Sequence, residues 1–351
     1  KADGGTFDGN VTMAGTLAVT GATTLSSNLS VDSGTIKLDG NYPTGTGNVA
    51  LGDTALDSIS TGASNTAIGA DALTSNTSAS NNTAVGYQSL YANTTGAENT
   101  SVGDASLDAN TTGSYNTALG RNALTSNTTA SFNTAIGRLS LFLNVTGTNN
   151  TAVGSGSLQS NTASNNTAVG SNALVSNTTA SNNTAVGYQA GDALINGAEN
   201  VAIGSGALSA EVAGDNTVAV GKDALRVQQT NSNLDMHNVA IGHSSGYSDT
   251  SGRFNTFVGS QSGYSNTTAS SNTAFGFQSL YSNTTGGDNT GSGVKALFAN
   301  TTGTLNVSVG SSSMRDNTTG SYNTSLGVNT LRFNTTASNN TAVGYHSLYS
   351  N

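Results

Sequence analysis

Apolar and polar positions recur along most of this chain with a period of 17 residues. Each repeat reads Asn-Thr-Ala-Val/Ile-Gly, two variable residues, Ala/Ser-Leu, two more variable residues, and Asn-Thr-Thr followed by Gly/Ala-Ser. A fixed short period is typical of stacked structural repeats rather than of a globule with one core. We therefore predict an all-β parallel solenoid, or β-roll, of 17-residue coils. The glycine after Val/Ile marks eighteen copies: Gly52, Gly69, Gly86, Gly103, Gly120, Gly137, Gly154, Gly170, Gly187, Gly204, Gly221, Gly242, Gly259, Gly276, Gly293, Gly310, Gly327 and Gly344.

Two short strands are predicted in each coil, one at Thr-Ala-Val/Ile and one at Ala/Ser-Leu-x. Asn and Gly in the remaining segments favour turns, because both tolerate left-handed backbone angles. Alternate side chains of a strand share a face, so Thr66 and Ile68 point one way and Ala67 the other. We expect the Val/Ile column and the Leu column to face the interior: Ile68 and Leu73, Val85 and Leu90, Ile136 and Leu141.

Residues 1–47 follow a different pattern, in which apolar and polar residues alternate over three to five residues between glycines. Strands this short do not build a sheet within one chain, so we predict an intertwined segment made by several chains. Pro43, Gly45 and Gly47 mark the junction with the eighteen-coil solenoid shaft predicted over 48–351.

Energetics favour stacking and association. Ordering 17 backbones costs on the order of 20 kcal/mol, whereas burying one Val, one Leu and one Ala returns about 5 kcal/mol. The remaining stabilisation must come from contacts with neighbouring coils and, because the coil is thin, from packing against identical chains. We expect a homotrimer.

Composition narrows the function classes. Charged residues make up 8% of the 351 residues, against about 25% in an ordinary domain. The net charge of −9 and the lack of a basic cluster argue against nucleic-acid binding. No apolar run is long enough to predict membrane insertion. The chain starts at Lys1 and stops within a coil at Asn351, so we expect it to belong to a longer polypeptide.

Little in the sequence predicts catalysis, a cofactor or a metal site, and we expect a protein that is not an enzyme. Residues 242–246 match the G-x-S-x-G nucleophile motif of hydrolases, but they fall on a degenerate copy of the repeat. The histidines, His237, His243 and His346, lack metal-ligand spacing. Asn-x-Ser/Thr triplets such as the one at Asn93 are generated by the repeat itself, so we interpret them as turns.

Two surface features keep alternatives open. Aromatic residues recur after the repeat glycine and after Leu, where they either pack over neighbouring coils or stack on sugar rings: Tyr87, Tyr91, Tyr188, Phe277, Tyr281, Tyr345 and Tyr349. A stacked row of threonines is a feature of ice-binding solenoids, although those usually carry Thr-x-Thr where this chain has Thr-Ala-Val/Ile. The row contains Thr66, Thr83, Thr117 and Thr134.

The period changes at two places, which we call slips. The repeat before Gly170 is one residue shorter than 17, and the repeat before Gly242 is four residues longer. Insertions in solenoids form loops, and loops carry binding functions. We therefore take the polar residues of the longer slip as candidate receptor contacts: Arg226, Gln228, Gln229, Asn231, Asn233, Asp235 and His237.

The motif resembles two known families. Asn200–Gly204 and Asn238–Gly242, both Asn-Val-Ala-Ile-Gly, are similar to the head repeats of trimeric autotransporter adhesins, which form parallel β-rolls of three chains. Over nearly the whole chain, segments such as 15–25 followed by arrays such as 82–91 resemble phage tail-fibre shafts. The second resemblance implies a trimeric tail fibre of a virion that attaches to a host glycan or protein receptor. The alternative is a bacterial surface adhesin or extracellular fibre, and an ice-binding solenoid is the minor alternative.

Overall fold

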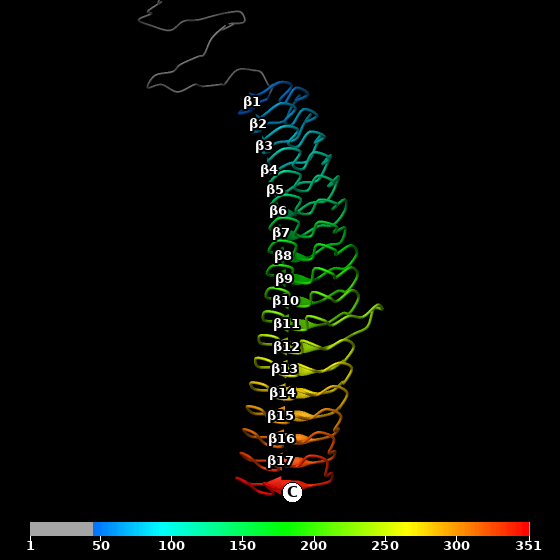
Figure 1. The fold of residues 1–351 in the computed structure, drawn as a ribbon. Helices are drawn as coiled ribbons and strands as arrows, with labels where there is room; N and C mark the ends of the chain where they lie inside the picture. Colours follow the sequence, from blue (N-terminus) through cyan, green and yellow to red (C-terminus); the bar gives the residue numbers. More distant parts are fainter. Residues whose placement is uncertain (1–44, 351) are drawn as a thin grey trace, which may run out of the picture. The chain divides into compact units, whose positions relative to one another are not determined.

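The computed structural model describes residues 45–350. Within this range it contains eighteen strands of three residues each and no helix. Each strand pairs in parallel with the next strand in the sequence, so successive coils stack one on another (Figure 1). This confirms the prediction of an all-β parallel solenoid of 17-residue coils. The predicted intertwined segment lies almost wholly outside the described residues.

The strands have the following bounds: β1 (Val49–Leu51), β2 (Thr66–Ile68), β3 (Thr83–Val85), β4 (Thr100–Val102), β5 (Thr117–Leu119), β6 (Thr134–Ile136), β7 (Thr151–Val153), β8 (Thr167–Val169), β9 (Thr184–Val186), β10 (Val201–Ile203), β11 (Val218–Val220), β12 (Val239–Ile241), β13 (Thr256–Val258), β14 (Thr273–Phe275), β15 (Thr290–Ser292), β16 (Val307–Val309), β17 (Thr324–Leu326) and β18 (Thr341–Val343).

The strand side chains that face the interior are not the ones predicted. Leu73, like Leu90 and Leu141, is fully buried as expected. Ile68, however, is 38% exposed, and Ala67 is the strand residue that points inward with no exposed surface. The placement of Ile68, Val85 and Ile136 in the interior was therefore wrong. The coil is so thin that its inner strand position holds Ala in most coils, and the larger β-branched side chains lie on the outside.

The second predicted strand is also absent from the described coils. The Ala/Ser-Leu-x segments form turns, and their leucines have left-handed backbone angles, as in Leu73 with a φ of 54°. The stack still satisfies the backbone there, because the Leu73 N–H donates to the Ser89 carbonyl of the next coil at 3.0 Å. A left-handed residue other than Gly costs roughly 1–2 kcal/mol. Burial of the Leu side chain offsets that cost.

The repeat glycines are required by close approach as well as by conformation. Gly69 has a φ of +129°, and a Cβ atom on it would lie 2.5 Å from the Gly86 carbonyl oxygen of the next coil. A side chain at this column would push successive coils apart. The glycines Gly52 to Gly137 therefore keep their predicted structural role.

Two ladders of buried asparagines hold the coils in register. In the strand-side ladder, formed by the residue before each strand, Asn65 Oδ1 accepts from the Asn82 N–H at 2.9 Å, and Asn82 Nδ2 donates to the Gly96 carbonyl. In the corner-side ladder, Asn110 Nδ2 donates to Asn93 Oδ1 at 2.8 Å and to the Gly113 carbonyl at 2.9 Å. Buried amides are tolerable only when paired, and here each coil supplies the partner of the next.

One coil replaces the inner Ala of the strand by Phe257, which is 1% exposed. The neighbouring coils compensate, because Gly246 and Gly263 stand where the repeat has Leu. A Cβ atom on Gly263 would lie 2.6 Å from the Phe257 ring, and one on Gly246 would lie 2.9 Å from it. The interior volume is thus conserved across three coils rather than within each one.

Candidate functional site

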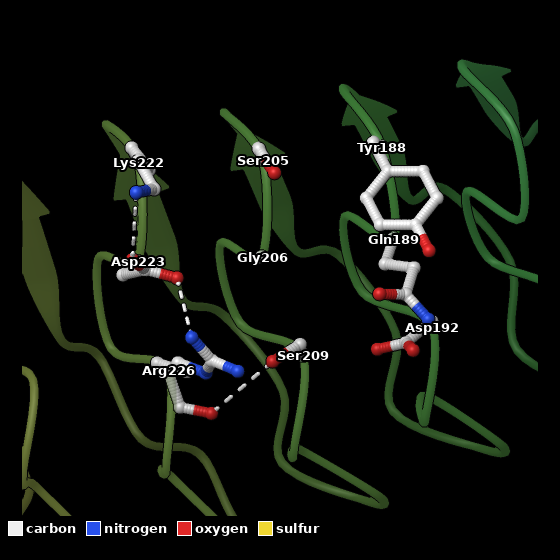
Figure 2. A pocket seen from close by; sticks show the side chains of 9 residues that line it. All are labelled: Tyr188, Gln189, Asp192, Ser205, Gly206, Ser209, Lys222, Asp223 and Arg226. Carbon is white, nitrogen blue, oxygen red and sulfur yellow. Dashed lines mark hydrogen bonds and ion pairs between the residues drawn. The ribbon is translucent and has the colours of Figure 1, made fainter.

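A notch in the surface lies beside strands β9, β10 and β11, on the turns that follow them (Figure 2). Its floor is the turn after β10, which carries only small residues: Ser205, Gly206 and Ser209. The turns on either side carry larger residues at the same repeat positions. One wall is formed by Tyr188, Gln189 and Asp192, and the other by Lys222, Asp223 and Arg226, around a cavity of about 440 Å³.

Charges on one wall are paired with each other. Asp223 Oδ1 accepts from Arg226 Nη1 at 2.9 Å, and Asp223 Oδ2 lies 3.8 Å from Lys222 Nζ. The Asp223 side chain is 13% exposed, whereas the side chains of Arg226 and Lys222 are 49% and 65% exposed. Figure 2 shows the carboxylate between the two cations. Both cations thus keep donors that face solvent.

The opposite wall combines an aromatic ring with an unpaired acceptor. Tyr188 is 55% exposed. Asp192 Oδ1 is buried and has no hydrogen-bond partner. Burial raises the pKa of Asp192 above its ordinary value, while backbone N–H groups and Arg226 oppose that rise. Asp192 also lines the cavity, so its carboxylate can accept from a ligand hydroxyl.

The longer slip lies beside the notch along the chain. Both slips fall at the same corner, between the two asparagine ladders: the shorter lacks one residue between Asn161 and Asn166, and the longer inserts four between Gln228 and Asn238. The inserted segment extends beyond the neighbouring coils between β11 and β12 (Figure 1). This corner is where the solenoid tolerates a change of length.

A buried carboxyl group anchors the insertion. Glu211, which has no exposed surface, replaces an asparagine of the corner-side ladder. Its Oε1 accepts from the N–H groups of residues 212–214 and from the N–H and hydroxyl of Thr230, at 2.7–3.1 Å. Its Oε2 accepts from Gln228 Nε2 at 2.9 Å. Six donors on one carboxyl fix both the start of the insertion and the turn of the coil before it.

Gln228 therefore differs from the other candidate receptor contacts. It is fully buried, and it links Glu211 to Asn238, whose Nδ2 donates to Gln228 Oε1 at 2.9 Å. It cannot reach a receptor in this structure, and its role is structural. The remaining candidates are exposed: Arg226, Gln229, Asn231, Asn233, Asp235 and His237.

Three of the exposed candidates lie at two defined places. Arg226 belongs to the notch. Asp235 and His237 lie at the end of the insertion, where Asp235 Oδ1 accepts from Asn216 Nδ2 at 2.7 Å and His237 stacks on Phe254 with 5.6 Å between ring centroids. Arg253 Nε donates to the Asp235 carbonyl at 3.0 Å. The Arg253 guanidinium also lies over the Phe254 ring.

The other sequence candidates occupy structural positions. Ser244, the central serine of the nucleophile-like motif, is 6% exposed, and the described residues contain no helix to follow it. Asn93 is buried and donates to the Gly96 carbonyl at 2.9 Å, so its amide is not accessible for glycosylation. His243 and His346 are exposed. Among residues 45–350, no three His, Cys, Asp or Glu side chains are placed to hold a metal ion.

The aromatic residues divide into packed and exposed ones. Tyr281 stacks between Tyr264 and Phe298, with ring centroids 5.1 and 5.2 Å apart, so it packs over neighbouring coils. Tyr87 and Tyr188 are instead more than half exposed. Tyr188 alone of these two lines the notch.

Sequence reasoning missed the notch and the role of Glu211. Both leave a signal in the 17-residue register. Ser205, Gly206 and Ser209 are three small residues between larger ones at the same repeat positions, and Glu211 stands one period before Gln228 in a column of asparagines.

Comparison with protein-family models, with curated proteins and with solved structures finds no match to this chain. In the part of the chain that the structure describes, no helix is long and apolar enough to cross a membrane. The function must therefore be argued from the coils themselves.

Proposed function

We propose that this chain is the shaft of a trimeric attachment fibre, of the kind found in phage tail fibres, and that it acts outside the cell as part of a virion. A stiff stack of coils would hold receptor contacts at a distance from the anchor. Eighteen stacked strands about 4.8 Å apart give a length of roughly 85 Å. Three copies of each contact would raise the avidity for a host surface.

One observation carries the proposal: the outer face of the sheet carries a nearly continuous column of apolar side chains beside a column that is mostly Thr. The third residue of every strand points outward and none is buried, and it is Val, Ile or Leu in all strands except β14 and β15. Eighteen strands of three residues make a face of roughly 800 Å². About 800 Å² per partner is the size of a standard specific interface.

A second copy of the chain is the partner that matches this face in length. Parallel packing around an axis along the stack would bring the same column of each chain together, as cyclic symmetry requires. The number three comes from the resemblance to trimeric fibres and adhesin heads. A bacterial surface adhesin of the same build is the alternative, and it shares the assembly but differs in its anchor.

The test is the mass of the purified chain by light scattering. We expect three chains, and we expect Ile136→Lys combined with Ile203→Lys to yield single chains, because it places charges in the apolar face. The control is Ser155→Lys, at a turn column where the repeat already carries Lys222. A monomeric wild-type chain would overturn the trimer, and so would trimers that tolerate both lysines.

Ice binding is a second candidate because one observation favours it. Eight consecutive strands place Thr at their first position, in register from Thr66 to Thr184, and this row lies on the outer face beside the Val/Ile row. The same face cannot contact both ice and another chain. Thermal hysteresis in a solution of single chains would favour ice binding over the fibre, and its absence would remove this candidate.

A further inference from the structure

We propose that the notch between the turns after β9 and β11 is a binding site for a neutral saccharide unit. This inference deepens the proposed attachment function, since it names the class of receptor and the residues that contact it. It stands on the shape of the notch, on its charge balance and on the groups that line it.

The shape comes from a local break in residue size. Ser205, Gly206 and Ser209 form a floor one coil wide, so the two walls stand two coils apart, which is roughly 10 Å. The cavity of about 440 Å³ falls within the range of roughly 300–1,000 Å³ that is usual for small-molecule sites. It can take one or two pyranose rings between the walls.

The charges favour an uncharged ligand. Two carboxyl groups, Asp192 and Asp223, face two cations, Lys222 and Arg226, so the formal charges cancel. Asp223 contacts both cations. An anionic ligand would compete with Asp223 for them and would approach Asp192, which disfavours phosphate and acidic sugars.

The remaining groups match the surface of a sugar, which has apolar C–H faces and hydroxyl groups that both donate and accept. The exposed ring of Tyr188 offers a flat apolar surface with a polar tip. The Asp192 carboxylate lines the notch and can accept from a hydroxyl group. Arg226 and Lys222, both largely exposed, and the Gln189 amide can donate to hydroxyl oxygens.

The experiment is saturation-transfer NMR and titration of the full chain with the methyl glycosides of glucose, galactose and mannose, and with sialic acid as the acidic probe. We expect at least one neutral glycoside to bind at millimolar concentration and sialic acid not to bind. Binding of sialic acid alone, or of none of the four, would overturn the proposal.

Variants that fill the notch locate the binding. Ser205→Tyr with Ser209→Tyr introduces residues that other coils carry at the same repeat positions, as Tyr87 and Tyr91 do, so the fold should persist. We expect at least a tenfold loss of affinity. The matched control, Ser155→Tyr, changes the same repeat position as Ser205 in another coil and should bind as the wild type does.

Asp192→Asn tests the carboxylate as an acceptor and should weaken binding while leaving the notch open. Unchanged binding in the filled variant would place the sugar elsewhere and overturn the site. The mass of the wild-type chain and of each variant is measured in the same samples. A wild-type trimer that binds no sugar overturns this inference alone, whereas a monomeric wild-type chain overturns the fibre.

Discussion

The regular coils and the coils around the longer slip pair their buried hydrogen-bonding groups in different ways. In the regular coils, most asparagines of the corner-side ladder pair with the one before, as Asn110 does with Asn93 at 2.8 Å. Around the slip, the same column reads Leu194, Glu211, Gln228 and Asp249. A carboxyl group there gathers six donors instead of a ladder neighbour.

The difference shows that the interior of this solenoid depends on hydrogen bonds between buried polar groups as much as on apolar packing. Most asparagine side chains in the ladder bond to the asparagine of a neighbouring coil, so the ladder needs asparagine at the same position in both coils. A change of coil length breaks that exchange, and the chain replaces it with side chains that satisfy the freed backbone groups locally.

The largest effect is expected from Glu211→Ala. It leaves the buried N–H groups of residues 212–214 and of Thr230 without their acceptor, and each buried unpaired donor costs about 1–3 kcal/mol. We expect the coils around the insertion to lose on the order of 4 kcal/mol, seen as faster amide hydrogen exchange at Gly214 and Thr230.

The comparison variant is Asn110→Ala, in a regular coil. It removes one rung of the ladder and should cost about 2 kcal/mol, with faster exchange confined to the neighbouring coils. Equal effects of the two variants would contradict the special role of Glu211.

The next effect tests the shared interior of three coils. Phe257→Ala should cost about 3 kcal/mol, because it empties a fully buried ring site between two glycines. Adding Gly246→Leu and Gly263→Leu restores the residues of the repeat and should recover most of the loss in thermal unfolding. Gly263→Leu alone should destabilise, since its side chain would overlap the Phe257 ring. Additive effects of the three changes would show that the sites are independent.

The third change keeps the side-chain volume and restores the residue of the repeat, so its effect is a change in the pH dependence of stability. Burial raises the pKa of Asp249 to about 8, against hydrogen bonds from the Gly252 N–H and from Asn266 and Asn255, which lower it. In the unfolded chain this carboxyl ionises near pH 3.9. Between these values the folded state holds more protons than the unfolded state, so stability falls as pH rises from about 4 to about 8.

Asp249→Asn should remove that dependence and raise the unfolding temperature above about pH 8. Thermal unfolding at about pH 5 and about pH 9 measures the difference. A variant as pH-sensitive as the wild type would assign the dependence to another group.

The sequence predicted the parts of the fold that its period determines. The glycine column and the buried Leu73 column follow from spacing alone, and both are confirmed. The orientation of the strand was predicted wrongly. A strand of only three residues, such as Thr-Ala-Ile, does not show from its sequence whether the middle residue or the two outer residues face the interior. Ala67 points inward and is fully buried, and most other coils also hold Ala at this position.

The conformation of the leucines could not be predicted from local preference. Left-handed angles favour Gly and Asn, yet Leu73 adopts one because its side chain fills the interior and its N–H bonds to the next coil. The candidate site was predicted in part. Arg226 lies in the notch, but Gln228 is buried, since sequence alone did not show that it continues the asparagine column.

Cross-linking through a single introduced cysteine tests the central claim, a parallel trimer packed through the outer face, most directly. The chain contains no cysteine, so Ile136→Cys adds the only one. In a parallel trimer this residue meets its own copies near the axis, and mild oxidation should yield covalent dimers, whereas Ser155→Cys should stay monomeric under denaturing conditions. Absence of the Ile136→Cys cross-link, or equal cross-linking at both positions, would contradict the account.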